Sequence, residues 1–145
     1  MRHLGSTNEL KAQQDAEIVI AFRKIFSIYG GIVGVERIYE MVASAPAPRF
    51  FVSPERAAIV IADLRRGKRP NMQHAKARMY ADLDRIVSDI QSQFPCMDML
   101  NICRKAVLRP APEFYKSTRQ IKHIISERQH QCYATRKQRL RFCCM

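Results

Sequence analysis

Hydrophobic side chains recur along most of the chain at intervals of three and four residues, rather than at the alternate positions typical of a strand. These intervals place the side chains on one face of an α-helix. The pattern predicts helices over residues 13–29, 34–43, 54–66, 73–93, 97–108 and 118–131. The fold class predicted from the pattern is all-α.

The predicted helices also have recognisable ends. Gly30 and Gly31 follow the first helix, and glycine readily takes the left-handed conformation that closes a helix. Before the third helix, Ser53 supplies a capping hydroxyl and Pro54 lacks the N–H that would need a partner. Glu55 then places a carboxylate near the positive end of the helix dipole. These signals set the end of the first helix and the start of the third.

A stretch of the sequence recurs farther along the chain. We call the difference in residue number between equivalent positions of the two copies the repeat shift. Residues 46–53 read PAPRFFVS and residues 110–117 read PAPEFYKS, with five of the eight identical. The repeat shift also aligns apolar residues of the flanking helices, such as Ile38 with Ile102. Because a repeat gives both halves the same packing problem, positions that are apolar in both are expected in the core. The chain is therefore predicted to be a tandem repeat of two tri-helical, helix-turn-helix-like units.

The repeat divides the chain into four parts. They are a polar N-terminal segment over 1–12, a first unit with a basic connector over 13–69, a second unit over 70–132, and a basic cysteine-containing tail over 133–145. Units of about 60 residues are near the lower size limit for folding alone, so we expect the two to support each other. The third helix of the first unit is apolar almost all round. This predicts that Ala58 and Ile59 face either the other unit or a second chain in a homodimer.

The repeated motif ends in aromatic residues for which two roles are open. Phe50 and Phe114 are expected to be core anchors, because large rings in water leave much apolar area exposed. The alternative is a stacking platform for unpaired bases, which needs exposed rings beside cations. Arg49 suits such a platform, but Glu113 at the equivalent position repels phosphate. Packing is the favoured interpretation.

Charge adds a functional expectation. Lys and Arg number 25 against 13 Asp and Glu, a formal net charge of +12. Such an excess predicts attraction to polyanions, with nucleic acid ahead of an anionic membrane or an acidic protein. One cluster lies between the units and another in the tail, and each could simply be a solvated stretch. Two such clusters on a basic helical chain favour nucleic acid.

Candidate contacts to nucleic acid are basic side chains of the third helices, the connector and the tail. They are Arg56, Arg65, Arg66, Lys68, Arg69, Arg119, Lys122, Arg136, Lys137, Arg139 and Arg141. A helix-turn-helix would place the third helices in the major groove, but a short turn, often with Gly, typically joins its two helices. The longer connection here lacks Gly, and the helix over 57–64 is largely apolar. Both features favour contacts to phosphates over reading of bases.

The expected function is that of a basic, non-enzymatic nucleic-acid-binding protein, with DNA favoured over RNA and gene regulation as one use. The alternative is a helical adaptor or phage structural protein whose basic surface binds acidic partners. Catalysis is not expected, because the sequence has no Gly-rich phosphate loop, nucleophile elbow or paired His-Glu metal motif. The histidines, His3, His74, His123 and His130, are scattered over different segments. No cofactor or metal is expected.

The cysteines and the hydropathy indicate a setting. Cys103 is expected to be a small core residue. Cys132, Cys143 and Cys144 lack the paired spacing typical of a zinc site, and an odd total of five argues against a disulfide framework. The chain opens with polar residues rather than a signal peptide, and no stretch has the roughly 20 apolar residues of a membrane span. A reducing cytoplasm, without membrane contact, is expected.

The repeated motif also carries a resemblance. The run over residues 46–57, followed by the run over 110–115, resembles a group of small basic proteins with a PAPRFFVS-like motif from gut Bacteroidetes and their phages. The similarity covers residues 17–125 approximately. The resemblance implies a genomic setting and no particular activity.

Overall fold

Helices are the regular secondary structure of the described part of the chain. The structure, a computed structural model, describes the backbone of residues 4–129 and the side chains of residues 9–129. Its helices are α1 (Leu4–Tyr29), α2 (Val35–Ser44), α3 (Pro54–Arg65), α4 (His74–Gln93), α5 (Met99–Ala106) and a last helix over 118–129. No β-strand occurs between residues 4 and 129, which confirms the predicted all-α class. Within the described residues, no helix combines the length and apolar content needed to cross a membrane.

The predicted helix ends agree with the structure, with one large exception. The backbone N–H of Gly30 donates to the carbonyl oxygen of Phe26 at 2.7 Å, and Gly31 follows at φ +87°, closing α1 as predicted. The start of α1 was predicted at residue 13, but the helix begins at Leu4. The prediction was wrong because the polar residues before 13 give no apolar stripe, although Leu10, Lys11 and Ala12 are good helix formers.

Serine caps begin both third helices. The Ser53 hydroxyl oxygen accepts from the backbone N–H of Arg56 at 3.2 Å, with Pro54 in the first turn. The Ser117 hydroxyl oxygen accepts from the N–H of Gln120 at 3.2 Å, and the Gln120 side chain accepts in return from the N–H of Ser117 at 2.9 Å. This reciprocal arrangement is a capping box. The predicted starts of both helices are confirmed.

Equivalent helices begin or end at positions that are related by the repeat shift, as the two copies of the motif are. α1 and α4 end at residues 29 and 93, and α2 and α5 begin at residues 35 and 99. α3 and the last helix begin at residues 54 and 118.

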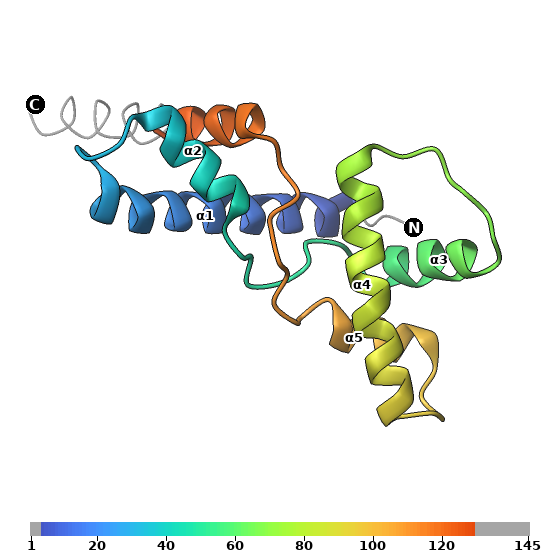
Figure 1. Ribbon diagram of the computed structural model, residues 1–145. Coiled ribbons are helices and arrows are strands. Elements are labelled where there is room, and N and C mark those ends of the chain that lie inside the picture. The colour runs from blue at the N-terminus through green and yellow to red at the C-terminus, as the bar shows by residue number, and fades with distance from the viewer. Residues whose placement is uncertain (1–3, 130–145) are drawn as a thin grey trace, which may run out of the picture.

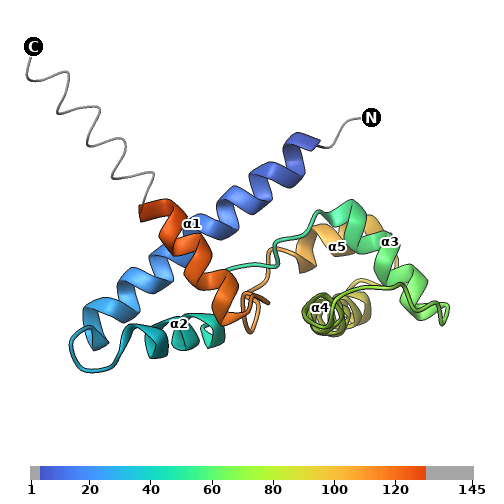
Figure 2. The ribbon, with the colours of Figure 1, turned by 90° about the horizontal axis from the view of Figure 1, so that it is seen from above.

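Each third helix lies with helices from the other half of the sequence (Figures 1 and 2). α3 packs against α5 and α4, whereas α1 packs against α2. The last helix lies beside α2 and α1, where Lys122 Nζ is 3.2 Å from a carboxylate oxygen of Glu36. Farther along it, Arg128 donates to the carbonyl oxygen of Ala12 at 3.5 Å. The packing therefore crosses the boundary that the sequence places at residue 69.

The contact of α3 with the other half uses a different face from the one predicted. Ala57, Val60 and Ile61 are buried, whereas Ile59 is 56% exposed. Ala58 is half-buried against the core. The helix meets the other half as expected, but Ile59 takes no part in that contact.

Two crossing segments, residues 45–53 and 107–117, carry the chain from one side to the other. Where they cross, the backbone N–H of Ala47 donates to the carbonyl oxygen of Ala111, and the N–H of Ala111 donates to the carbonyl oxygen of Ala47, both at 3.0 Å. The Phe50 and Tyr115 rings stack with centroids 6.2 Å apart. The aromatic pair at the equivalent positions, Phe51 and Phe114, stacks at 6.4 Å. The two hydrogen bonds between Ala47 and Ala111 are equivalent under the repeat shift. The two ring pairs are equivalent in the same way.

The burial of Phe50 and Phe114 distinguishes between the two roles proposed for them, core anchors and a stacking platform. Phe50 is 1% exposed and Phe114 is 2% exposed, within one core that runs through both halves. Rings buried to this degree cannot present a face to an unpaired base. The packing interpretation is confirmed, and Cys103 is likewise buried as expected.

Candidate nucleic-acid interface

Positive charge is distributed unevenly between the two ends of the molecule. Residues 54–109, which contain α3, α4 and α5, hold 11 Lys or Arg and 6 Asp or Glu. α1, α2 and the last helix together hold 7 Lys or Arg and 6 Asp or Glu. Among the residues that the structure describes, the excess of positive charge is therefore larger on α3, α4 and α5, which favours the approach of a polyanion there.

The connector between α3 and α4, residues 66–73, presents three of the predicted cations. Arg66 and Lys68 lie 3.9 and 3.8 Å from a carboxylate oxygen of Asp63, and their side chains are 69% and 64% exposed. Arg69 is also exposed, and Gly67 makes the turn with φ +83°. Ion pairs this long and this exposed contribute little, so all three cations can turn toward phosphates.

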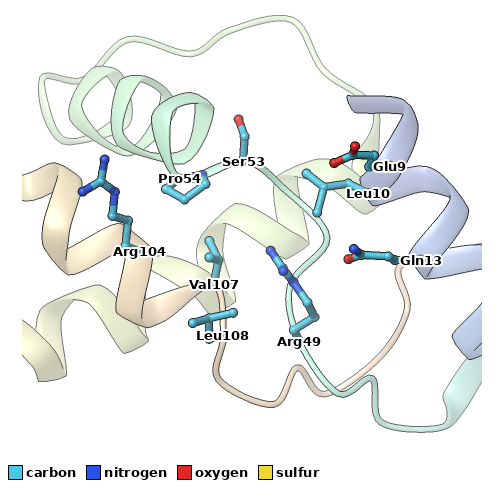
Figure 3. Close-up of a pocket in the computed structure, with 9 residues that line it drawn as sticks. All are labelled: Glu9, Leu10, Gln13, Arg49, Ser53, Pro54, Arg104, Val107 and Leu108. Carbon is cyan, nitrogen blue, oxygen red and sulfur yellow. The ribbon is translucent and has the colours of Figure 1, made fainter. Parts of the chain in front are cut away.

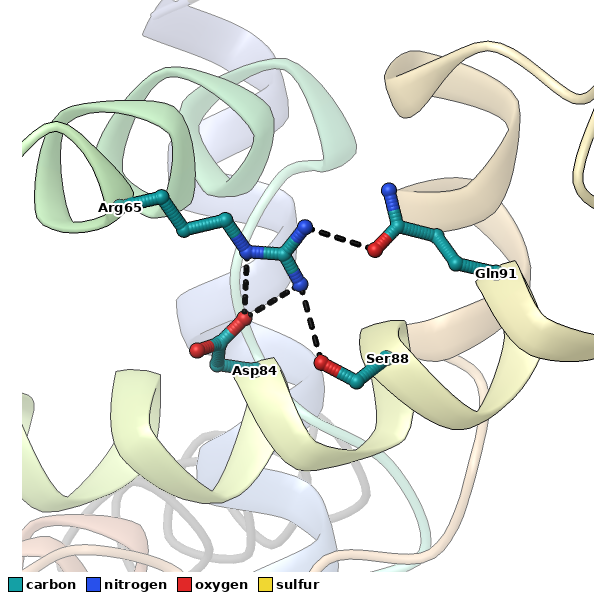
Figure 4. Close-up of polar contacts among 4 residues, drawn as sticks. All are labelled: Arg65, Asp84, Ser88 and Gln91. Carbon is teal, nitrogen blue, oxygen red and sulfur yellow. Dashed lines mark hydrogen bonds and ion pairs between the residues drawn. The ribbon is translucent and has the colours of Figure 1, made fainter.

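Arg65 forms hydrogen bonds with side chains of α4 (Figure 4). Its Nε and one terminal nitrogen donate to a carboxylate oxygen of Asp84 at 3.0 and 2.7 Å. The terminal nitrogen that donates to Asp84 also donates to the Ser88 hydroxyl oxygen at 3.0 Å. The other terminal nitrogen donates to the Gln91 side-chain oxygen at 2.6 Å. The guanidinium thus joins the end of α3 to α4. Arg65, expected to contact nucleic acid, has a packing role here because its donors are already used.

The predicted cations of the two third helices lie in different helix clusters. Arg56 is exposed on α3 beside Tyr80 of α4, where burial raises the pKa of the Tyr80 hydroxyl and the arginine opposes that rise. Arg119 and Lys122 are exposed on the last helix, which lies beside α1 and α2. The structure therefore does not bring Arg56 together with Arg119 and Lys122.

The connection from α2 to α3 differs from that of a helix-turn-helix. Residues 45–53 run extended through the crossing, and α3 then packs on α5 and α4 instead of on α2. The compact pair of consecutive helices that would enter a major groove is therefore not formed by α2 and α3.

The tail cations lie outside the described residues. They are Arg136, Lys137, Arg139 and Arg141. The cysteines at 132, 143 and 144 fall in the same stretch.

A cleft of about 370 Å³ holds two arginines that the sequence analysis did not select as contacts (Figure 3). It lies between the beginning of α1, the first crossing segment, the beginning of α3 and α5. Arg49 comes from the crossing segment and Arg104 from α5. Arg104 donates to the Asn101 side-chain oxygen at 3.2 Å. Comparison of the two copies could have identified both arginines, because the residue equivalent to Arg49 is Glu113 and the residue equivalent to Arg104 is Glu40.

Arg49 is half-buried in this cleft. Its Nε donates to the carbonyl oxygen of Phe50 at 3.1 Å, and the guanidinium carbon lies 5.8 Å from the centroid of the Phe51 ring. Desolvation lowers the pKa of Arg49 from its usual value. A cation held in this way gains from any anion that enters the cleft.

The part of the chain that the structure describes contains no candidate metal-binding site. Within those residues, no three His, Cys, Asp or Glu side chains gather as a metal site would need. Comparison with family models, with curated proteins and with solved structures gives no match for the chain.

Proposed function

We propose that this chain is a non-enzymatic, basic protein that binds nucleic acid through phosphate contacts, with DNA favoured over RNA. The observation that supports the proposal is the accumulation of weakly paired cations at the two ends of α3. The connector cations lie at its C-terminal end, and Arg49 and Arg104 line the cleft at its N-terminal end. The 12 residues of α3 separate the two groups by about 18 Å. Such a spacing suits contacts to several phosphates of one backbone.

We also propose that the architecture is a duplication with exchanged third helices. One tri-helical unit would consist of α1, α2 and the last helix, and the other of α4, α5 and α3. The repeat shift relates the ends of α1 and α4, the starts of α2 and α5, and the starts of α3 and the last helix, which supports this division. The reciprocal hydrogen bonds of Ala47 and Ala111 support it independently, because reciprocal contacts are typical of a two-fold relationship.

Salt-dependent binding tests the nucleic-acid proposal. Fluorescence anisotropy would be measured with duplex DNA, single-stranded DNA and RNA over a salt series, because affinity for phosphates falls steeply as salt rises. Replacing Arg66, Lys68 and Arg69 with Gln should lower the slope of log affinity against log salt by up to about 2.7. Absence of binding to all three ligands at low salt would overturn the proposal.

A control triple variant separates the connector from net charge. Replacing Arg23, Lys24 and Arg37 with Gln removes the same charge from exposed positions on α1 and α2. We expect this variant to keep most of the affinity and the salt slope. An equal loss in both triple variants would mean that total charge, and not the connector, governs binding.

A second candidate function, a helical adaptor, is favoured by apolar exposure at one end of the molecule. The turn from α1 to α2 presents five large hydrophobic side chains, Phe26 (49% exposed), Ile28 (64%), Tyr29 (37%), Ile32 (76%) and Val35 (45%). Such a group suits a protein partner better than a phosphate backbone. Replacing Phe26 and Ile32 with Ser should abolish an adaptor contact and leave nucleic-acid affinity unchanged.

The proposed setting is a reducing cytoplasm. Cys103 is a buried free thiol and Cys96 an exposed one, which supports an environment where thiols stay reduced.

A further inference from the structure

We infer that the cleft at the N-terminal end of α3 binds a single phosphate group between Arg49 and Arg104. The inference deepens the proposed function and rests on it, since the phosphate would belong to a nucleic-acid backbone. A free nucleotide carries the same chemistry and is distinguished below.

The first argument is the incomplete pairing of Arg49. Its Nε is used by the carbonyl oxygen of Phe50, and its terminal nitrogens form no ion pair with a carboxylate among the described residues. The side chain is nevertheless half-buried. Taking a guanidinium out of water without a counter-ion is costly, so an anion that binds beside Arg49 is stabilised.

The second argument comes from the equivalent positions in the other half. The repeat shift relates Arg49 to Glu113, and Arg78 donates to that carboxylate at 2.7 Å. The residue equivalent to Arg78 is Gln14, whose amide donates instead to the carbonyl oxygen of Phe114 at 3.1 Å. The residue equivalent to Arg78 is therefore neutral and bonds elsewhere, so Arg49 has no ion pair that corresponds to the one between Arg78 and Glu113. One copy is neutralised within the chain and the other is not.

The same contrast holds for Arg104. Its equivalent, Glu40, forms an ion pair with Arg37 at 2.8 Å. Arg104 bonds only to the neutral Asn101 among the described residues. Arg49 and Arg104 thus have no carboxylate partner among the described residues, and both line one cleft.

The geometry of the cleft suits a phosphate. In Figure 3 the Arg49 side chain points toward Ser53 and Pro54, whereas Arg104 lies on the other side of Pro54 with its guanidinium directed away from Arg49. A phosphate shared by the two arginines therefore requires the exposed Arg104 side chain to rotate toward Arg49. Two planar guanidinium groups favour phosphate because each can donate two hydrogen bonds to it. The positive end of the α3 dipole adds to the attraction. Glu9 lines the same cleft and opposes it.

The rest of the lining has room for more than phosphate. Leu10, Val107 and Leu108 are apolar, and the volume of about 370 Å³ falls at the small end of the range for ligand sites. A phosphate with its attached sugar fits these dimensions.

The test follows the Nε–Hε NMR signals of Arg49 and Arg104 during titration with inorganic phosphate, thymidine monophosphate and a 5′-phosphorylated thymidine dinucleotide. We expect both signals to shift and saturate together, and most tightly with the dinucleotide. R104Q should weaken dinucleotide binding about tenfold, and R37Q, at an exposed arginine outside the cleft, should leave it unchanged. E9Q should tighten binding, because it removes the opposing carboxylate.

The outcomes separate this inference from the proposed function. If DNA binds and R104Q keeps the affinity and salt slope of the unaltered protein, the cleft inference is overturned and the proposed function stands. If DNA does not bind but inorganic phosphate or the monophosphate shifts both arginine signals, the proposed function fails and the site belongs to a free nucleotide or phosphate. If no phosphate compound shifts either signal, the cleft is not a phosphate site.

Discussion

Ala47 and Ala111, which the repeat shift relates, donate to each other's carbonyl oxygens at the same distance, 3.0 Å. The two crossing segments run antiparallel at this point. Each then leads into a third helix that packs on the far side of the molecule. The two alanines are only 2% exposed, which excludes water from the paired backbone groups.

The exchange of third helices is testable with a matched pair of substitutions. Ile61 of α3 and Ile125 of the last helix occupy equivalent positions and are 0% and 2% exposed. Ile→Ala at either site should lower the free energy of unfolding by about 2–4 kcal/mol, because it leaves a cavity. Native-state hydrogen exchange should show faster local opening in α4 and α5 for I61A, and in α1 and α2 for I125A.

The control for this pair is I59A, since Ile59 is 56% exposed. Its effect on stability should stay within about 0.5 kcal/mol. Faster opening of α1 and α2 in I61A would contradict the exchange.

Arg65 should matter for stability more than its surface neighbours do. R65A removes four donated hydrogen bonds that join α3 to α4. Because the Arg65 side chain is about one-third exposed, solvent screens the interaction, and we expect a loss of about 1–2 kcal/mol in chemical denaturation. R66A, which loses only a 3.9 Å exposed pair, should cost less than about 0.5 kcal/mol. Equal costs would argue against the Arg65 contacts.

Tyr115 should make stability depend on pH in the alkaline range. Its hydroxyl donates to a carboxylate oxygen of Asp82 at 2.6 Å, and burial together with that carboxylate raises its pKa above the usual value. The unfolded chain loses the tyrosine proton near pH 10, whereas the folded chain retains it. The stabilisation is therefore complete below about pH 10 and is lost as pH rises toward the folded pKa.

The comparison for Tyr115 is Y115F, measured by urea denaturation at neutral and alkaline pH. The variant should be less stable by roughly 1.5 kcal/mol at neutral pH, and the difference from the unaltered protein should shrink as pH rises above 10. A difference that stays constant with pH would mean that the folded pKa is not raised.

The two described cysteines should differ in reactivity. Burial raises the pKa of the Cys103 thiol to about 11, whereas Cys96 is exposed. At pH 8, Cys103 should react with iodoacetamide on the order of 100-fold more slowly, because the thiolate is the reactive form. Peptide mapping by mass spectrometry measures both rates, and unfolding in urea should bring them close together. Similar rates in the folded protein would show that Cys103 is accessible.

Helix ends were the most predictable part of the fold. Gly30 and the Ser53 and Ser117 caps act through bonds to residues within four positions, so their effect depends on local sequence alone. The burial of Phe50 and Phe114 was also predictable, because both copies retain the same large apolar ring.

The partners of these surfaces were not predictable. The apolar positions of α3 identify a buried face, but Ile61 would satisfy the same pattern against α2 or against α5. The choice depends on where the first crossing segment leads, and no short-range signal encodes that direction. The bonds of Arg65 to α4 were not predictable for a similar reason, because Asp84 and Gln91 are distant in sequence and adjacent only in the folded protein.

The covalent connection between the two halves has an evolutionary consequence. In a homodimer of single units, one codon would set the residue at both symmetry-related positions, so an arginine in one cleft would require an arginine in the other. Joining the halves in one gene lets each copy mutate alone. Under the proposed duplication, Arg49 and Glu113 descend from one position that now carries opposite charges on the two sides of a single polypeptide.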